Sequence, residues 1–209
     1  MRAHVDAVAT ISRGCAATIW ALGVYHAHDD IIGHMSDEAQ EEIYSTDDVQ
    51  AVAAVIGPRG RAMRAADGSY TLTGFWRFAS GNAPSHWLPL GAEMSDEAGE
   101  TLDAGAFAVP VADVERIDDW HVMGLQGAGS NSLKCEGVPV PAHRFVSLAA
   151  ILENQTPAFA RPNTPSVHKR QAGPALGMSS TRSALISGVP AGVTATSISL
   201  ATSRATRSL

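Results

Sequence analysis

The stretch that decides the fold is residues 67–81, DGSYTLTGFWRFASG. Asp67 followed by Gly68 is a typical turn of a β-hairpin, because glycine adopts the positive φ that such turns need. After this turn, mostly apolar residues occupy every second position: Tyr70, Leu72, Gly74, Trp76 and Phe78. This period predicts a β-strand with one face toward a core.

Further short apolar runs of strand length follow this stretch. They are 87–92 (WLPLGA), 106–111 (AFAVPV), 114–120 (VERIDDW) and 132–140 (SLKCEGVPV). Residues typical of turns separate these runs. The pattern therefore predicts a small antiparallel β-barrel or sandwich over about residues 58–148.

Helices are predicted on the N-terminal side of the strands. Over residues 3–26, apolar residues recur at spacings of three and four, which places them on one helix face. Ser36 followed by Asp37 and Glu38 is a helix start, because acidic side chains favour the positive N-terminal end of a helix. Residues 37–44 (DEAQEEIY) fit that second helix.

Charge is divided unevenly along the chain. Residues 1–153 contain all 21 acidic residues and 9 of the 15 basic ones, whereas residues 154–209 contain basic residues and no acidic ones. An acidic body argues against nucleic-acid binding as the main task. Because we recognise neither a signal peptide nor an uncharged apolar run of membrane-spanning length, we expect a cytoplasmic protein without a membrane contact.

The last part of the chain has a different composition. Of the 31 residues from Ser179 to Leu209, 13 are Ser or Thr, which predicts poor order. Only 172–186 (AGPALGMSSTRSALI) suggests a helix. The two cysteines, Cys15 and Cys135, lie far apart and indicate neither a metal cluster nor a disulfide framework.

The first candidate site is a histidine-rich stretch, 26–34 (HAHDDIIGH). On a helix, His26, Asp30 and His34 would share a face at spacings of four, which can hold a metal. Nothing else in the chain supplies an obvious further ligand. We therefore interpret the stretch as a polar helix end and predict no metal site.

Two other segments have features that suit a planar ligand. In 74–81 (GFWRFASG), Ser80 follows a strand directly, and Gly81 would let a ring approach closely. In 124–130 (GLQGAGS), three glycines resemble a phosphate loop, but a strand rather than a helix follows, so the context of such loops is not met. A strand end with its turn, and a tight connection between strands, are the simpler interpretations.

Four motifs, taken in order, resemble one family: the acyl-CoA-dehydrogenase-like flavin monooxygenases, which include the oxygenase components of 4-hydroxyphenylacetate and steroid-phenol hydroxylases. The motifs lie in 20–43, in 58–81, in 119–130 (DWHVMGLQGAGS, similar to the family's D-x-W-x-V-x-G-L-R-G-T-G-S) and in 138–144 (VPVPAHR). In the first two, the matching residues are Trp20, Gly23, Val24, His28, Gln40, Glu41, Glu42, Pro58, Gly60, Ala62, Tyr70, Leu72, Gly74, Trp76, Phe78, Ser80 and Gly81. The resemblance covers roughly residues 5–150.

The resemblance implies an α+β fold with an N-terminal helical domain, a β-domain and a C-terminal four-helix bundle that also forms a tetramer. Residues 1–57 would be the end of the helical domain, and residues 58–150 the β-domain. Residues 151–209 would be a degenerate tail with a possible first bundle helix at 172–186. Because family members are much longer, we expect a chain that is truncated at both ends and lacks most of the bundle.

The resemblance also implies an activity. In the family, a separate flavin reductase supplies reduced FMN or FAD, and the oxygenase reacts it with O₂ to form a flavin C4a-hydroperoxide. This oxidant hydroxylates an aromatic substrate, often a phenol. Two alternatives remain open, an acyl-CoA dehydrogenase and a non-catalytic truncated remnant.

Site residues are implied by the same resemblance. Ser80 falls beside flavin N5, and Phe78 would pack by the isoalloxazine ring. His28 would orient or deprotonate a phenolic substrate, since imidazole titrates near working pH, and Trp20 would line the same pocket. The other residues assigned to flavin binding are Ala79, Gly81, Gly127, Gly129 and Ser130.

The chain departs from the family pattern at three places. Gln126 and Ala128 stand where the family usually has Arg and Thr in the Gly-rich loop. The stretch 51–57 (AVAAVIG) offers no hydroxyl, although members often have Ser there. These departures affect contacts that the resemblance assigns to flavin or substrate.

Overall fold

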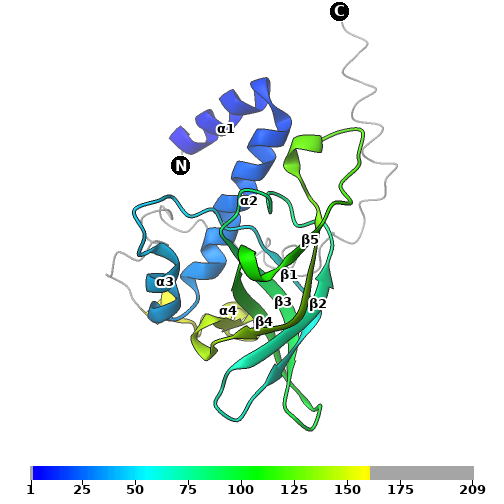
Figure 1. The fold of residues 1–209 in the computed structure, drawn as a ribbon. Helices are drawn as coiled ribbons and strands as arrows, with labels where there is room; N and C mark the ends of the chain where they lie inside the picture. The colour runs from blue at the N-terminus through cyan, green and yellow to red at the C-terminus, as the bar shows by residue number, and fades with distance from the viewer. Residues whose placement is uncertain (1, 161–209) are drawn as a thin grey trace, which may run out of the picture. The chain divides into compact units, whose positions relative to one another are not determined.

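The computed structural model of the protein describes residues 2–160. The N-terminal part is helical, with α1 (Arg2–Gly14), α2 (Ala16–Gly33) and α3 (Asp37–Tyr44), and a seven-stranded sheet follows (Figure 1). The strands are β1 (Val55–Arg64), β2 (Tyr70–Trp76), β3 (Trp87–Ser95), β4 (Thr101–Pro110), β5 (Glu115–Ile117), β6 (Ser132–Val140) and β7 (Phe145–Ser147). Short helices α4 (Leu148–Leu152) and α5 (Pro157–Ala160) end the described part. The helix predicted at 172–186 lies outside the described residues.

The sheet is mixed, in the order β5-β6-β2-β1-β3-β4-β7. Strands β1 and β2 form the predicted hairpin, with Gly68 at a φ of +86° and the Asp67 carboxylate accepting from the Ser69 amide. All neighbouring strands are antiparallel except β1 and β3, which are parallel. The expected wholly antiparallel arrangement is therefore wrong at this pair. The reason is that residues 77–86 cross the end of β1, so that β3 runs beside β1 in the same direction.

One hydrophobic core is built around Trp76, the last residue of β2. Its indole is fully buried, and its Nε1 donates a hydrogen bond to the Gly91 carbonyl at 2.8 Å. A Cβ at Gly60 would lie 2.3 Å from this indole, and one at Gly74 would lie 2.6 Å from it. The two glycines, paired across β1 and β2, therefore leave the space that the indole fills. The other residues of this cluster include Leu72, Leu88, Leu90, Phe107, Val109, Leu133 and Val140.

A second core joins the helices to the sheet. Helices α2 and α3 contribute Ile32, Met35, Ala39 and Ile43, which pack with Val52, Ala106, Ala108 and Val146. Helix α3 begins as predicted, because the Ser36 side chain accepts a hydrogen bond from the Ala39 amide and acts as the N-cap. The single helix predicted over 3–26 is wrong at Cys15. There the backbone is extended, with a φ of −155°, and divides α1 from α2.

Two predicted strands are shorter than expected. Strand β2 ends at Trp76, because Phe78 has a positive φ of 64° and turns the chain out of the sheet. The strand predicted over 114–120 is confined to Glu115–Ile117. Beyond it, the Asp119 carboxylate accepts hydrogen bonds from the amide and hydroxyl of Ser132, which hold the chain in a loop. Residues 87–92 and 132–140 are strands as predicted.

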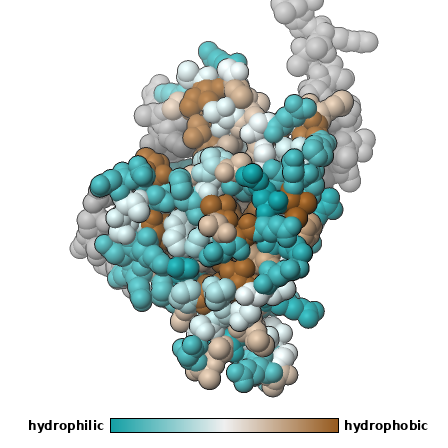
Figure 2. All heavy atoms as spheres, in the orientation of Figure 1, coloured by the Kyte–Doolittle hydropathy of each residue, from teal (hydrophilic) through white to brown (hydrophobic). Residues whose placement is uncertain are grey.

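The surface carries separate hydrophobic areas among hydrophilic side chains (Figure 2). Large exposed hydrophobic residues include Ile11, Trp20, Leu22, Phe78, Met123 and Leu125. Among the helices of residues 2–160, none combines the length and the apolar character that crossing a bilayer requires. Both cysteines are free thiols; that of Cys15 is exposed and that of Cys135 buried.

Candidate functional site

The two segments that the sequence suggested for ligand contact lie against each other. The turn after β2 and the loop before β6 are joined by a hydrogen bond from the Gly81 amide to the Ala128 carbonyl, at 2.7 Å. The hydroxyls of Ser80 and Ser130 are 2.8 Å apart, and both side chains are buried. Residues 78–81 and 127–130, separated by almost fifty positions, therefore form one surface.

Helix α2 completes this surface with two aromatic side chains. The Trp20 indole Nε1 donates a hydrogen bond to the Ser80 hydroxyl at 3.0 Å. The Tyr25 hydroxyl donates to the Gly81 carbonyl at 2.8 Å. Trp20 was assigned to the site from sequence, whereas Tyr25 was not. The only indication of Tyr25 in the sequence was its position on the same predicted helix, five residues after Trp20.

The ring that lies close to Gly81 belongs to Tyr25, whereas the sequence suggested that of a planar ligand. The φ of Gly81 is +74°, and a Cβ there would lie 2.7 Å from the Tyr25 ring. The ring that approaches this glycine is thus an aromatic ring of the chain itself. Gly129 also has a positive φ, of 52°, but a Cβ there would meet nothing within 4 Å. A Cβ at Gly127 would lie 3.2 Å from the Ala17 Cβ.

Asn82 is a site residue that the sequence reasoning missed. Its side chain is fully buried, and its amide nitrogen donates to the carbonyls of Ala79, Gly129 and Asn131 at 2.6, 2.9 and 3.3 Å. Asn82 therefore fixes the turn after β2 to the loop before β6. Its Oδ1 has no hydrogen-bond partner among the described residues. The signal available in the sequence was an Asn immediately after Ser80-Gly81.

A small pocket of about 270 Å³ lies where α2, the turn and the loop meet. Its lining is largely apolar and consists of Thr18, Ala21, Leu22, Tyr25, Gly81, Ala83, Pro84, Gly127, Ala128 and Gly129. Pockets for small ligands usually have volumes of about 300–1,000 Å³. At about 270 Å³, this pocket is smaller than that range.

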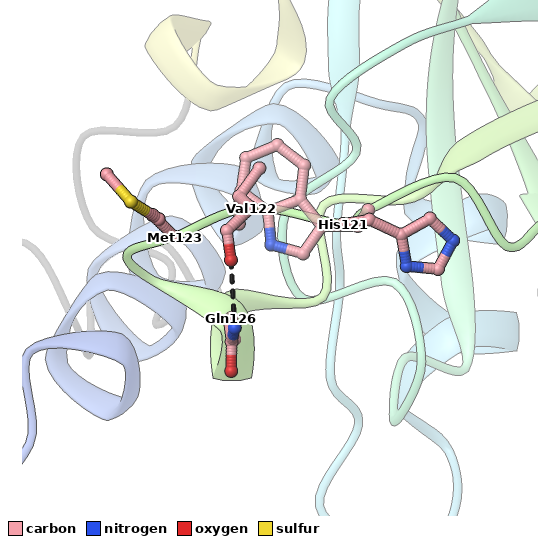
Figure 3. A pocket seen from close by; sticks show the side chains of 5 residues that line it. His121, Val122, Met123 and Gln126 are labelled. Atoms are coloured by element: carbon pink, nitrogen blue, oxygen red, sulfur yellow. Dashed lines mark hydrogen bonds between the residues drawn. The ribbon is translucent and has the colours of Figure 1, made fainter.

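A second, more open hollow lies on the loop between β5 and β6 (Figure 3). It has a volume of about 690 Å³ and is lined by Trp120, His121, Val122, Met123 and Gln126. His121 and Met123 extend to opposite sides, and the Gln126 amide donates to the Val122 carbonyl at 2.9 Å. Gln126, which stands where the family usually has Arg, therefore forms a hydrogen bond within its own loop.

Phe78 lies beside the open hollow, next to Trp120. The residue is 63% exposed, with the Arg77 guanidinium 5.2 Å from the centroid of its ring and the Trp120 ring edge-on at 6.2 Å. A positive φ is unusual for an aromatic residue and costs about 1–3 kcal/mol, so the surrounding contacts must hold it. The strain presents a flat apolar ring at the surface.

His28 lies in a separate group of contacts. Its Nδ1 accepts a hydrogen bond from the Ala54 amide, at 2.7 Å, where the chain enters β1. Burial lowers the pKa of His28 from 6.5 to about 4, because removal from water disfavours the charged imidazolium. His28 and Trp20 thus share helix α2, but Trp20 reaches the turn after β2 and His28 reaches the start of β1.

The histidine-rich stretch is arranged by contacts with other side chains. His34 Nδ1 lies 2.8 Å from the Thr156 hydroxyl, and its Nε2 lies 3.7 Å from the Asp30 carboxylate. Residues 2–160 contain no group of three or more His, Cys, Asp or Glu side chains that could hold a metal.

This arrangement defines the class of protein. Helices pack on a mixed sheet, and a hydroxyl-bearing turn meets a Gly-rich loop beneath a helix, as in the middle part of the acyl-CoA dehydrogenase fold. A solved structure with this fold, the 3-HSA hydroxylase from Rhodococcus sp. RHA1, matches 78% of this chain and 42% of its own, with a TM-score of 0.70 and 32% identity.

Sequence relatives give the family. The oxygenase subunit HsaA of a flavin-dependent monooxygenase from Rhodococcus jostii (strain RHA1) is 34% identical over 165 residues, 78% of this chain and 42% of the relative. The oxygenase component of an FADH₂-dependent resorcinol hydroxylase from Rhizobium sp. is 31% identical over 73% of this chain and 37% of the relative. No family model matches the chain. By sequence and fold, the chain is similar to the oxygenase subunits and components of flavin-dependent monooxygenases, and it spans about two fifths of the length of these relatives.

Proposed function

We propose that this chain holds a reduced flavin, FMN or FAD, against the turn 78–81 and takes part in the hydroxylation of an aromatic substrate. The observation that carries the proposal is the convergence of Trp20 and Ser130 on the Ser80 hydroxyl oxygen, beside the Gly-rich loop. Names of relatives support the activity, since they include flavin-dependent and FADH₂-dependent oxygenase components.

The residues present fit a flavin ring. Ser80 offers a hydroxyl whose direction is restrained by two neighbours, and Phe78 offers an exposed aromatic face. Gly127 and Gly129 bring backbone close to the site without side chains. When bound, the reduced flavin supplies the reaction with O₂ that inserts oxygen into the substrate. The chain's own residues would orient the ring, restrain the proton at N5 through Ser80 and exclude water.

Ser80 would act on the flavin, and His28 and Trp20 on the substrate. The Trp20 indole fills the space beside Ser80 and would form a wall for an aromatic ring. His28 would contact the phenolic oxygen. Ala79, Gly81, Gly127, Gly129 and Ser130 would shape the flavin side of the site.

Partners follow from the same proposal. An oxygenase component that receives reduced flavin requires a flavin reductase, and the family's oxygenase-subunit names imply one. The substrate would be a small aromatic molecule. A homo-oligomer such as the family's tetramer would supply further walls to a site that the described residues build only in part.

Anaerobic titration of the chain with reduced FMN and reduced FAD tests the proposal. We expect saturable binding of one of them, and a weakening of about 3- to 10-fold in Ser80→Ala, as expected for the loss of one hydrogen bond. Ser85→Ala is the matched control. The Ser85 hydroxyl belongs to the same turn and donates to Gly81, which keeps its hydrogen bond from Tyr25. A folded chain that binds neither flavin would overturn the proposal.

The alternative of an acyl-CoA dehydrogenase receives no support from the relatives described, which are monooxygenases and hydroxylases.

A further inference from the structure

The side-chain NH₂ group of Asn82 reaches the backbone on both sides of Ser130. It donates to the Gly129 carbonyl at 2.9 Å and to the Asn131 carbonyl at 3.3 Å, and these two residues flank Ser130 in the chain. The same nitrogen donates to the Ala79 carbonyl at 2.6 Å, directly before the serine of the turn. One side chain therefore contacts the backbone beside both members of the hydroxyl pair.

The surroundings of this amide decide its orientation. A carbonyl oxygen can only accept a hydrogen bond, so the atom of Asn82 that faces three carbonyls must be the nitrogen. The Oδ1 atom at the other side has no partner among the described residues. A buried unpaired oxygen lowers stability, and an apolar side chain of similar size would avoid that loss. What Asn82 supplies instead is the donor capacity of its NH₂ group.

The turn and the loop have few other restraints on their separation. Strand β2 ends at Trp76 and β6 begins at Ser132, so both segments lie outside the strands that they continue. Backbone hydrogen bonds from the Ala79 and Gly81 amides, at 3.3 and 2.7 Å, join the turn to the loop. The Asn82 side chain adds two more across the same gap.

We infer that Asn82 is a positioning residue for the proposed flavin site, because its NH₂ group holds the hydroxyls of Ser80 and Ser130 at their separation of 2.8 Å. The inference rests on the proposed function and adds a residue to it. Asn82 is fully buried and acts through the loop, without contact to a ligand. It is not among the residues that match the family's pattern, which ends at Gly81 in this part of the chain.

The hydroxyl pair is sensitive to small movements of the loop. Hydrogen bonds between hydroxyls need a separation of about 2.5–3.0 Å between their oxygens. Without the NH₂ group the loop is held less closely, and Ser80 keeps its hydrogen bond from the Trp20 indole but loses the one shared with Ser130. A ligand then has to order this hydroxyl when it binds, which lowers its affinity.

NMR of the Trp20 indole tests the inference without any ligand, because the Nε1–H donates to the Ser80 hydroxyl. Asn82→Leu keeps the size of the side chain and removes the NH₂ group. We expect it to shift the proton and nitrogen resonances of Trp20 Nε1–H and to speed the exchange of this proton with water. Asn131→Leu is the matched control. The Asn131 side chain accepts from the Trp120 amide within the loop between β5 and β6, so its loss should leave the Trp20 resonances unchanged.

Anaerobic titration with reduced FMN and reduced FAD gives the second readout. Asn82→Leu should weaken binding by about 3- to 10-fold in the wild-type background, as the loss of one restrained hydrogen bond would. In the Ser80→Ala background it should weaken binding by less than about 2-fold, since there is no hydroxyl left to position. A merely structural role would weaken binding by the same factor in both backgrounds, and that result would overturn the inference.

Asn82→Asp covers the case in which Asn82→Leu does not fold. Its carboxyl has nearly the shape of the amide and donates a hydrogen bond only while it is protonated. Compared with the wild type at the same pH, we expect little change at about pH 5 and weaker flavin binding with a shifted Trp20 resonance at about pH 9.

An equal deficit of Asn82→Asp at both pH values would overturn the inference, as would an unchanged Trp20 resonance in Asn82→Leu. A wild-type chain that binds neither reduced flavin, while Asn82→Leu still shifts the Trp20 resonance, would instead overturn the proposed function. The positioning of the two hydroxyls by Asn82 would then stand.

Discussion

At Gly81, two separate restraints act on one residue. The backbone φ of +74° is a conformation that side chains with a Cβ rarely adopt, and the Tyr25 ring occupies the place where a Cβ would project. Gly99, in the β3–β4 turn, has a similar φ of +84° but nothing within 4 Å. A comparison of the two glycines therefore distinguishes the cost of backbone strain from the cost of a steric collision.

We predict that Gly81→Ala destabilises the chain more than Gly99→Ala does. The shared backbone strain costs about 1–2 kcal/mol, and the collision with Tyr25 adds about 1–3 kcal/mol at Gly81 alone. Urea unfolding followed by circular dichroism measures both. Equal losses for the two variants would show that Tyr25 moves aside without cost.

At the scale of elements, an ion cluster ties α3 to the turn before β7. The Glu42 carboxylate of α3 accepts hydrogen bonds from both Arg144 and His143, and the Arg144 guanidinium lies 4.9 Å from the centre of the Trp87 ring. These contacts lower the pKa of Glu42 from 4.5 to about 2, chiefly through the hydrogen bonds from Arg144. Helix α3 also closes the second core, so this cluster supports the junction of helices and sheet.

The sign of its pH dependence follows from that lowered pKa. A carboxylate whose pKa is lower in the folded state stabilises the fold above the unfolded value of 4.5, and that contribution is lost as the pH falls toward 2. We predict that Glu42→Gln lowers the urea midpoint at pH 7 and that the difference from wild type shrinks below pH 4.5. The effect should be moderate, because the Glu42 side chain is partly exposed.

Glu41→Gln provides the matched control for this measurement. Glu41 is the adjacent exposed residue of α3 and takes no part in the cluster. Its substitution should change the midpoint little at either pH. A pH-independent difference for Glu42→Gln would contradict the assignment.

At the scale of the whole described region, the two cores share one sheet. Leu72 belongs to the core around Trp76, and Ile32 belongs to the core beneath the helices. Strand β4 contributes to both, with Phe107 in the first and Ala106 and Ala108 in the second. Because successive side chains of a strand point to opposite faces, the sheet couples the two cores.

We therefore predict that residues 2–160 unfold in one transition. Leu72→Ala and Ile32→Ala should each cost about 2–5 kcal/mol, as is usual for such truncations in a buried core. Each should shift tryptophan fluorescence and far-ultraviolet circular dichroism together. Separate transitions in the two signals, with Ile32→Ala moving only one of them, would show that the helices unfold independently.

Much of the local structure could be predicted because its causes are local. The period of two over 70–76, the Asp67-Gly68 turn and the Ser36 cap depend on neighbours within a few residues. The parallel pairing of β1 with β3 could not be read in this way, since strand periodicity is the same in either direction. The break at Cys15 was also hidden, because the apolar spacing continues through it.

The candidate site is likewise divided between features that local sequence predicts and features that depend on tertiary packing. The sequence by itself determined the family, the β-strands and the residues Trp20, His28 and Ser80 as candidates, through motifs that occur in order along the chain. Only the tertiary structure decided that Trp20 donates to Ser80, that Asn82 joins the turn to the loop, and that the Ala54 amide donates to His28. The physical reason is that these hydrogen bonds join residues 26 to 60 positions apart, and their directions depend on how helix and sheet pack.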